Sequence, residues 1–246
     1  MPEPVAPMIV HYYPGHFPPA RANLGPNHAA IGAGLLLVIR GRTILFRGEA
    51  WGGPSAIVPI AGQPAMTPTP AGEYRLKDPE PYITPTWANS RIKWGTPIKP
   101  SPVDPTDVWY LQSVKQGREN WASVKRDFGM TRNEILDAYA EITQKPTSQL
   151  PAQWLLNDFG PLAVRFYEDK NRNGRQDLPV ERSSGAMFHT TPQNEAETRS
   201  GVPPKLESSH GCIHLKPRDR DTLVGIGAFK SGIKLIIHSY SEHYGA

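Results

Sequence analysis

Proline constrains this chain more than any other residue type. There are 27 prolines among 246 residues, about twice the usual share. Proline has no backbone N–H and disrupts a helix interior, so this load indicates many loops and turns. Apolar residues come instead in short runs of strand length, bounded by turn residues. These patterns predict a mainly β protein with a few helices, of the α+β class, rather than a helical bundle.

Size and charge exclude several classes of protein. A chain of 246 residues can bury a substantial core without disulfides or metals. The net charge is only +4, and no basic run interleaved with aromatics indicates a nucleic-acid partner. No stretch approaches the ~20 apolar residues of a membrane helix. Residues 1–10 lack the basic and apolar segments of a signal peptide. This leaves export by a non-classical route, a leader outside this sequence, or action inside the cell.

Several segments predict strands. Residues 35–39 (LLLVI) and 43–46 (TILF) flank a turn at Gly41 and predict a hairpin. Shorter strands are predicted at 56–60, 73–76, 162–167 and 233–238. A helix is predicted over 218–229, between the predicted strands at 162–167 and 233–238. The opening stretch 11–16 (HYYPGH) is interpreted as an aromatic loop packed on the core.

The region from residue 77 to about 150 has a different character. Prolines interrupt it repeatedly up to Pro105, so loops are expected there. A helix follows, because Thr131 and Glu134 form a capping-box pattern and apolar residues then recur at helical spacing until Pro146. The region is interpreted as an insertion on a β scaffold that serves as a lid or a substrate wall.

The single cysteine, Cys212, has two interpretations. It cannot form an internal disulfide, and a lone cysteine is most often a small buried hydrophobe. The alternative is a catalytic nucleophile, and that requires a base, a group that orients the base, and backbone N–H groups for the oxyanion. Cys212 lies in residues 208–215, which read SSHGCIHL. Gly211 allows the tight backbone geometry that an oxyanion hole requires.

Three histidines are candidates for the base. His210 and His214 each lie two residues from Cys212 and would share its face in an extended segment. His189 lies upstream, at the end of a predicted strand from Ala186. A strand end can present a base to a distant nucleophile, so the residues alone leave the choice open.

The sequence resembles the L,D-transpeptidase catalytic domain, also called the YkuD domain. That family has a His, a gap of somewhat under twenty residues, and then Ser/Thr-His-Gly-Cys, which matches Ser209 to Cys212 here. Residues 69–74 (TPAGEY) also resemble the family's Thr-Pro-x-Gly segment. The resemblance covers about residues 34–76 and 160–240, with the elements in the same order. It implies an L,D-transpeptidase-like β-sandwich or barrel with a helical-loop insertion.

The resemblance assigns roles to individual residues. It makes Cys212 the nucleophile and His189 the base, oriented by the backbone carbonyl of Thr190. The amides of Gly211 and Cys212 would form the oxyanion hole, and the site-shaping or substrate-contacting residues would be Ser209, His210 and His214. The chain departs from the pattern in its longer gap of residues 190–208, in Thr190 where Gly or Ser is usual, and in His214 where Arg or Asn is usual.

The implied organisation is an N-terminal extension (residues 1–33) and a catalytic domain (34–240) with an insertion at about 77–150. The implied activity is acyl transfer on peptidoglycan stem peptides in the periplasm or cell wall, without a cofactor. With no signal peptide seen, an antibacterial effector is also predicted, with secretion machinery and an immunity protein as partners. The alternative is a non-catalytic peptidoglycan-binding module. A papain-like peptidase is disfavoured because His189 precedes Cys212.

A weaker pattern lies in residues 169–177 (DKNRNGRQD). Asp169, Asn171, Asn173 and Asp177, with Gly at the sixth position, match the first part of a calcium loop. The Glu expected at the twelfth position is replaced by Val, and Glu follows at the thirteenth. An Asn-Gly hairpin turn between two strands is the favoured interpretation, so no metal is predicted and calcium is the weaker alternative.

Overall fold

The computed structural model describes residues 6–17 and 33–245, which form two compact units. The first unit takes in the chain up to Glu80, Ala163–His189 and the chain from Lys205 onward. The second consists of Pro81–Leu162 and Thr190–Pro204. The predicted extension at 1–33 falls largely outside the described residues. The role of the inserted region as a lid or substrate wall stays a prediction.

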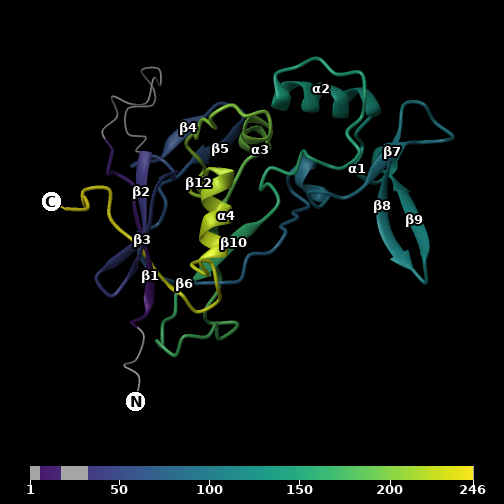
Figure 1. Ribbon diagram of the computed structural model, residues 1–246. Coiled ribbons are helices and arrows are strands. Elements are labelled where there is room, and N and C mark those ends of the chain that lie inside the picture. Colours follow the sequence, from purple (N-terminus) through teal and green to yellow (C-terminus); the bar gives the residue numbers. More distant parts are fainter. Residues whose placement is uncertain (1–5, 18–32, 246) are drawn as a thin grey trace. The chain divides into compact units, whose positions relative to one another are not determined.

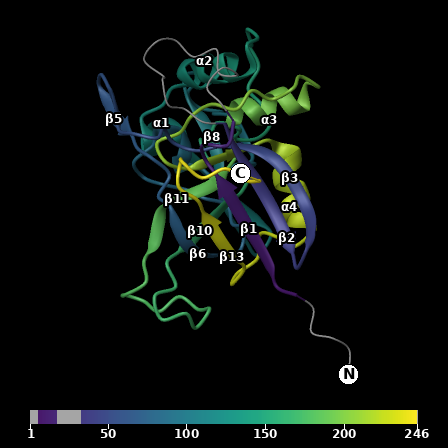
Figure 2. The same cartoon turned by 90° about the vertical axis from the view of Figure 1, so that its left-hand side faces the viewer.

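The first unit is built on a closed eight-stranded barrel with strand order β1-β13-β6-β10-β11-β12-β3-β2 (Figure 1). Figure 2 shows β2, β1 and β13 side by side, and β1 pairs antiparallel with β2 and parallel with β13. The mainly β, α+β fold class is therefore confirmed. The barrel strands are β1 (Met8–Tyr13), β2 (Ala33–Arg40), β3 (Thr43–Trp51), β6 (Gly72–Leu76), β10 (Ala163–Tyr167), β11 (Ser183–His189), β12 (Ile213–Leu215) and β13 (Lys234–Ile237).

Three further elements complete this unit. They are β4 (Val58–Ile60), β5 (Gln63–Met66) and α4 (Pro217–Gly225). The predicted hairpin is confirmed as β2 and β3, with Gly41 in the turn at φ +59°. The later strands are confirmed as β6, β10 and β13. Helix α4 ends earlier than predicted, because Gly227 adopts a positive φ of 74° that does not continue a helix.

The loop interpretation of residues 11–16 is wrong for residues 11–13, and only residues 14–16 form a turn. Residues 11–13 belong to β1, whose side chains Met8, Val10 and Tyr12 alternate into the barrel core. Tyr12 and Val10 are fully buried. The alternation of buried side chains begins at Met8, before the aromatic residues. Pro14-Gly15 then ends the strand.

The second unit combines a small sheet with helices. The expectation of loops up to Pro105 is wrong for β7. This strand forms an antiparallel sheet with β8 and β9, which were not predicted. Strands β8 and β9 are joined by a tight turn with positive φ at both Gln116 (51°) and Gly117 (74°), which suits a two-residue hairpin. The elements are η2 (Ala88–Arg91), β7 (Ile98–Pro100), β8 (Val108–Lys115), β9 (Arg118–Ser123), α1 (Val124–Phe128), α2 (Arg132–Thr143) and α3 (Pro192–Arg199).

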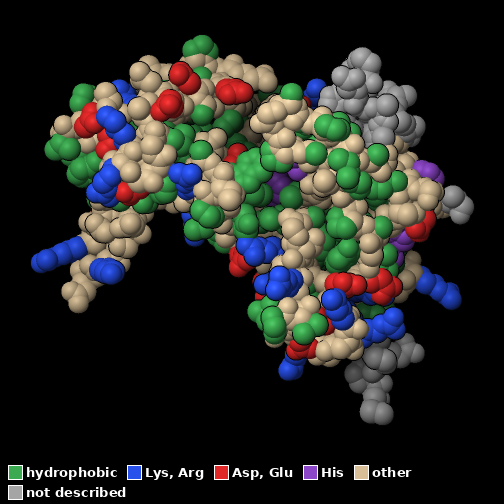
Figure 3. Space-filling view, turned by 180° about the vertical axis from the view of Figure 1, so that it is seen from behind, with side chains coloured by type: hydrophobic (Ala, Val, Ile, Leu, Met, Phe, Trp, Pro, Cys, Tyr) green, Lys and Arg blue, Asp and Glu red, His purple; other side chains and the backbone are tan. Residues whose placement is uncertain are grey.

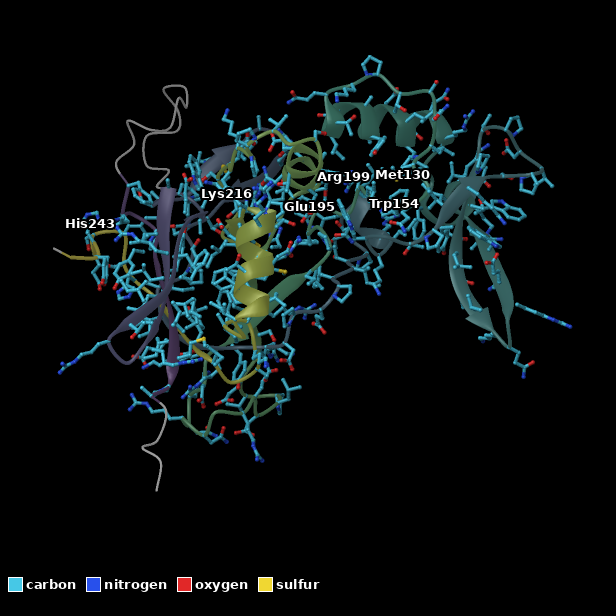
Figure 4. The ribbon with its side chains drawn as sticks, in the orientation of Figure 1. Met130, Trp154, Glu195, Arg199, Lys216 and His243 are labelled. Atoms are coloured by element: carbon cyan, nitrogen blue, oxygen red, sulfur yellow. The ribbon has the colours of Figure 1, made fainter. Side chains whose placement is uncertain are left out.

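The second unit has its own apolar core. Trp154, labelled in Figure 4, is buried in it, and Met130 packs against the same cluster. The predicted helix is confirmed as α2, whose Ile135 is fully buried while Ala138 and Tyr139 are partly buried against the cluster. No helix among the described residues is long and apolar enough to span a membrane.

The cap of α2 gives a stability prediction. Thr131 Oγ1 accepts a hydrogen bond from the Glu134 amide, and Glu134 Oε2 accepts one from the Thr131 amide at 2.7 Å. Thr131→Ala should lower the free energy of unfolding by about 1 kcal/mol, because it leaves a helix-end N–H without its partner. Urea unfolding followed by far-UV circular dichroism measures this. Thr147→Ala is the control, and an equal effect of both changes would contradict the capping role.

Candidate active site

The residues predicted to carry chemistry lie on one face of two adjacent strands. Phe188 of β11 and Ile213 of β12 point into the barrel core. Because side chains alternate along a strand, Met187 and His189 of β11 point to the opposite face. Cys212 immediately precedes β12 and His214 lies within it, so both face the same way. His189 is 5% exposed and lies at the last position of its strand, as predicted.

The register fixes how these residues oppose each other. Strands β11 and β12 run parallel, with Phe188 beside Ile213 and His189 beside His214. Cys212 therefore lies two residues before His214, opposite Met187 in the register and diagonal to His189. Diagonal neighbours on one face of a sheet are about 7–8 Å apart, within reach of long side chains. The fold thus brings Cys212 and His189 together from sites separated by residues 190–211 in the sequence.

His214 is held against His189. The two ring centroids are 4.7 Å apart in an edge-to-face arrangement. His214 Nδ1 lies 2.8 Å from the carbonyl oxygen of Glu207, and a carbonyl only accepts, so Nδ1 carries the proton. Burial is the main cause that lowers the pKa of His214 to about 4. His214 is therefore a neutral imidazole at physiological pH, with an unprotonated Nε2.

Cys212 is a protonated thiol at rest. Burial raises its pKa to about 11, although a hydrogen bond from the Met187 backbone acts in the opposite direction. Its side chain therefore carries very little thiolate at neutral pH. Any attack by this thiol requires that a base remove its proton during the reaction.

The Thr-Pro segment contacts the Ser-His-Gly-Cys segment directly. Thr67 Oγ1 donates a hydrogen bond to the carbonyl oxygen of His210 at 2.9 Å. The ring Nε2 of His210 lies 3.1 Å from the carbonyl oxygen of Pro64. His210 is thus anchored to the β5 region, and its site-shaping role stays a prediction. The contact is made by Thr67 rather than by Thr69, the threonine on which the resemblance was aligned.

A Gly-Gly pair supports the same loop, and the sequence interpretation missed it. The carbonyl oxygen of Gly52 accepts from the Ser209 amide at 3.1 Å. A side chain at Gly53 would place its Cβ 1.8 Å from the Thr67 carbonyl oxygen. Tyr240 donates its hydroxyl to the Gly53 carbonyl at 2.8 Å. The Gly-Gly pair at the end of β3 was a usable signal of close backbone approach, whereas nothing in the sequence identified Tyr240.

Ser209 organises the turn before Cys212. It is 3% exposed, and its hydroxyl donates to the carbonyl oxygen of Cys212. The same hydroxyl accepts from the Gly211 amide at 3.0 Å. The Gly211 amide is therefore engaged, and its predicted oxyanion role would require this bond to open. Gly211 has φ +111°, which only glycine adopts readily.

Thr190 begins the second unit directly after His189. It is fully buried, and its hydroxyl donates to Glu195 Oε1 on α3 at 2.6 Å. The long gap between His189 and Ser209 is largely explained, because Thr190–Pro204 belongs to the second unit and contains α3. The predicted orientation of His189 by the Thr190 carbonyl stays a prediction.

The calcium-like segment forms a long loop. Strands β10 and β11 pair antiparallel as predicted, but residues 168–182 join them, so the expected tight Asn-Gly turn is wrong. Asp169 forms an ion pair with Arg75 at 3.0 Å. Asp177 Oδ2 accepts from the side-chain amides of Asn171 and Asn173. Among the described residues, no group of three or more His, Cys, Asp or Glu is arranged to hold a metal ion.

The lowered pKa of His214 predicts a pH effect on stability. In the unfolded chain the His214 imidazole is protonated below about pH 6.5. In the folded protein it becomes protonated only below a pH of about 4. Stability should therefore fall between these pH values, by up to about 3 kcal/mol. Urea unfolding at pH 7, 6 and 5 should give a shallower decline for His214→Asn than for the wild type. Equal declines would contradict the assignment.

A family model described as YkuD, L,D-transpeptidase catalytic domain, matches residues 34–226. No curated protein and no solved structure matches the chain. The match spans well over half of the sequence and includes the Thr-Pro segment, β11 and the Ser-His-Gly-Cys segment. The chain therefore belongs to the YkuD family of L,D-transpeptidase catalytic domains.

Proposed function

We propose that this protein is a cysteine acyltransferase that acts on peptidoglycan stem peptides, with Cys212 as nucleophile and His189 as base. Membership of the YkuD family supports L,D-transpeptidase-type acyl transfer on peptidoglycan at the family level. One observation carries the finer proposal. Cys212, His189 and His214 share one face of β11 and β12, in a register that makes Cys212 and His189 diagonal neighbours.

The first half-reaction forms a thioester. Cys212 Sγ attacks the carbonyl carbon of the third stem residue, a meso-diaminopimelate or similar centre, while His189 takes the thiol proton. The negative charge moves to the carbonyl oxygen, and the Cys212 amide donates to it, joined by the Gly211 amide if its bond to Ser209 opens. The C–N bond then breaks, His189 returns the proton to the amine of the departing D-alanine, and the acyl group stays on Sγ.

The second half-reaction regenerates the thiol. An amine or water attacks the thioester carbonyl, His189 accepts its proton, and the C–S bond breaks with the proton returned to Sγ. An amine acceptor gives an L,D cross-link or an exchanged D-amino acid, whereas water gives L,D-carboxypeptidase activity. No cofactor takes part in this scheme.

The raised pKa of Cys212 supports a mechanism in which a base removes the thiol proton during the attack. A thiol with a pKa of about 11 is poorly reactive until a base removes its proton in the transition state. The same property favours the second candidate, a peptidoglycan-binding module with an inert cysteine. Simple thiol labelling at neutral pH would be slow for both, so it does not separate them.

Turnover separates the two candidates. Purified disaccharide-tetrapeptide is incubated with the protein, and soluble products and intact protein are both analysed by mass spectrometry. The proposal expects D-alanine release and a covalent adduct on the protein that neutral hydroxylamine removes, as a thioester requires. A binding module would retain the muropeptide without any adduct or product, and that result would overturn the proposal.

The biological setting is a separate proposal. Peptidoglycan lies outside the cytoplasm, so the site of action is the periplasm or cell wall. If the protein is an antibacterial effector with secretion machinery and an immunity protein as partners, it should harm cells only when exported. Expression with and without an added periplasmic leader tests this, with Cys212→Ala as the control. Equal growth with and without the leader would count against the effector role.

A further inference from the structure

We propose that the loop between β10 and β11, residues 168–182, binds a calcium ion through oxygen atoms of Asp169, Asn171, Asn173 and Asp177. The proposal is independent of the chemistry assigned to Cys212. Calcium loops place oxygen ligands at positions 1, 3, 5, 7 and 9, with glycine at position 6 for a sharp turn. Counting from Asp169, the glycine position is Gly174, whose φ is +78°.

The loop backbone is wrapped around the Asp169 carboxylate. Asp169 Oδ2 accepts from the Gly174 amide at 2.9 Å. Asn171 Oδ1 accepts from the Asn173 amide at 3.1 Å, and Asn173 Oδ1 accepts from the Arg175 amide at 2.8 Å. These bonds fold the loop backbone around the side chains at positions 1, 3 and 5.

One oxygen of Asp169 has no partner among the described residues. The Asp169 side chain is only 6% exposed. Its Oδ2 accepts from Arg75 and Gly174, but its Oδ1 is buried without a hydrogen bond. Leaving a buried carboxylate oxygen unsatisfied is costly, and such atoms in a folded protein often mark an ion or water. A cation bound inside the loop would satisfy this atom.

Asp177 completes the set from the other side. Its Oδ2 accepts from Asn171 Nδ2 at 2.6 Å and from Asn173 Nδ2 at 2.7 Å. These two amide groups place partial positive charge beside the carboxylate, where a cation would lie. If the two amide groups rotated, their oxygen atoms would replace their N–H groups beside Asp177. One cation could then contact oxygen atoms of all four side chains.

Glu181 closes the loop although it lies at the thirteenth position. It is 2% exposed, its Oε1 accepts from the Lys170 amide at 2.8 Å, and its Oε2 accepts from the Asp177 amide at 2.9 Å. The carboxylate joins the start of the loop to its ninth position. It thereby holds the ligand positions in place without being counted as a ligand.

Charge limits the strength of the site. Only Asp169 and Asp177 would contribute formal negative charge to the ion, and Arg75 already pairs with the first. Figure 3 shows acidic and basic side chains intermixed near this end of the barrel, where a cavity of about 500 Å³ is lined by Asp169, Lys170 and Arg172 among others. A site of low charge predicts a dissociation constant of about 10⁻⁴–10⁻³ M, the range of extracellular calcium modules. Neutral, adaptable oxygens favour calcium over magnesium, which demands stricter geometry.

The test is thermal unfolding of the full chain in EDTA, in 10 mM calcium and in 10 mM magnesium. Calcium should raise Tm by roughly 4 °C, since only the folded loop binds the ion, and magnesium should raise it much less. Isothermal titration calorimetry should give one site per chain in the stated affinity range. No calcium-specific rise, or an equal rise with magnesium, would overturn the proposal.

Matched variants distinguish the loop from general surface effects. D177N removes one ligand charge at an exposed position with little change in shape, and N171A removes a neutral ligand, so each should abolish the calcium-dependent rise. E168Q removes a neighbouring exposed carboxylate outside the ligand set and should keep the full rise. If D177N and N171A retain the rise, or E168Q loses it as well, the ion does not bind as proposed.

Discussion

Replacing Cys212 by alanine is expected to abolish the adduct formed with disaccharide-tetrapeptide and to lower the rate of D-alanine release by at least about 10⁴-fold. The reason is that alanine has no atom able to form the acyl bond, while the barrel around it is unchanged. Release of D-alanine followed by coupled assay, and intact-protein mass, measure the two effects. Because the chain has one cysteine, any hydroxylamine-sensitive thioester must lie at Cys212.

Cys212→Ser is the matched variant for this experiment. Serine is nearly the same size but its hydroxyl is a much weaker acid, so product formation should stay far below that of the wild type. Far-UV circular dichroism and Tm should be close to wild type for both variants. Wild-type turnover by folded Cys212→Ala would contradict the assignment of Cys212 as the nucleophile. It would not change the assignment of the chain to the family.

Replacing His189 by alanine should lower kcat by about 10²–10⁴-fold, the usual contribution of a positioned general base. The pKa of the Cys212 thiol is raised to about 11, so without His189 the attack at neutral pH depends on hydroxide or water as base. KM should change little, since the proposed role of His189 is proton transfer. The residual rate should rise with pH toward the pKa of the thiol.

His238→Asn is the control for the loss of a histidine from the same unit. His238 follows β13 and stacks on Tyr13 with ring centroids 3.8 Å apart, away from the β11–β12 pair in strand order. It should leave kcat close to the wild-type value. If His189→Ala also kept a wild-type kcat, the base would have to be sought elsewhere, first at His214.

Local sequence patterns predicted much of the barrel. The β2–β3 hairpin, β6, β10 and β13 follow from apolar runs bounded by glycine or proline, because one buried face and a defined turn fix a strand locally. The capping box at Thr131 predicted the start of α2 for the same local reason. In contrast, β7 was missed because the prolines around it indicate loops, and β8 and β9 were not predicted. These three strands pair with one another.

The candidate site was predicted in its residues but not in its geometry. Cys212 and His189 were singled out from motif spacing, and that spacing does not give the relation between two strands. The register of β11 and β12, which places His214 directly beside His189, arises from barrel closure. The supporting contact from Thr67 to His210 joins segments far apart in the chain.

The sequence by itself determined the candidate reactive groups, the mainly β class and the turns at glycines with positive φ, because these depend on residue chemistry and short-range sterics. The tertiary structure decided which side chains meet, which groups lose solvent and how far their pKa values move. Burial turned His214 into a neutral imidazole and Cys212 into a protonated thiol. Burial also left one oxygen of Asp169 without a partner among the residues that the structure describes. Desolvation of this kind depends on packing between distant segments, which no local pattern encodes.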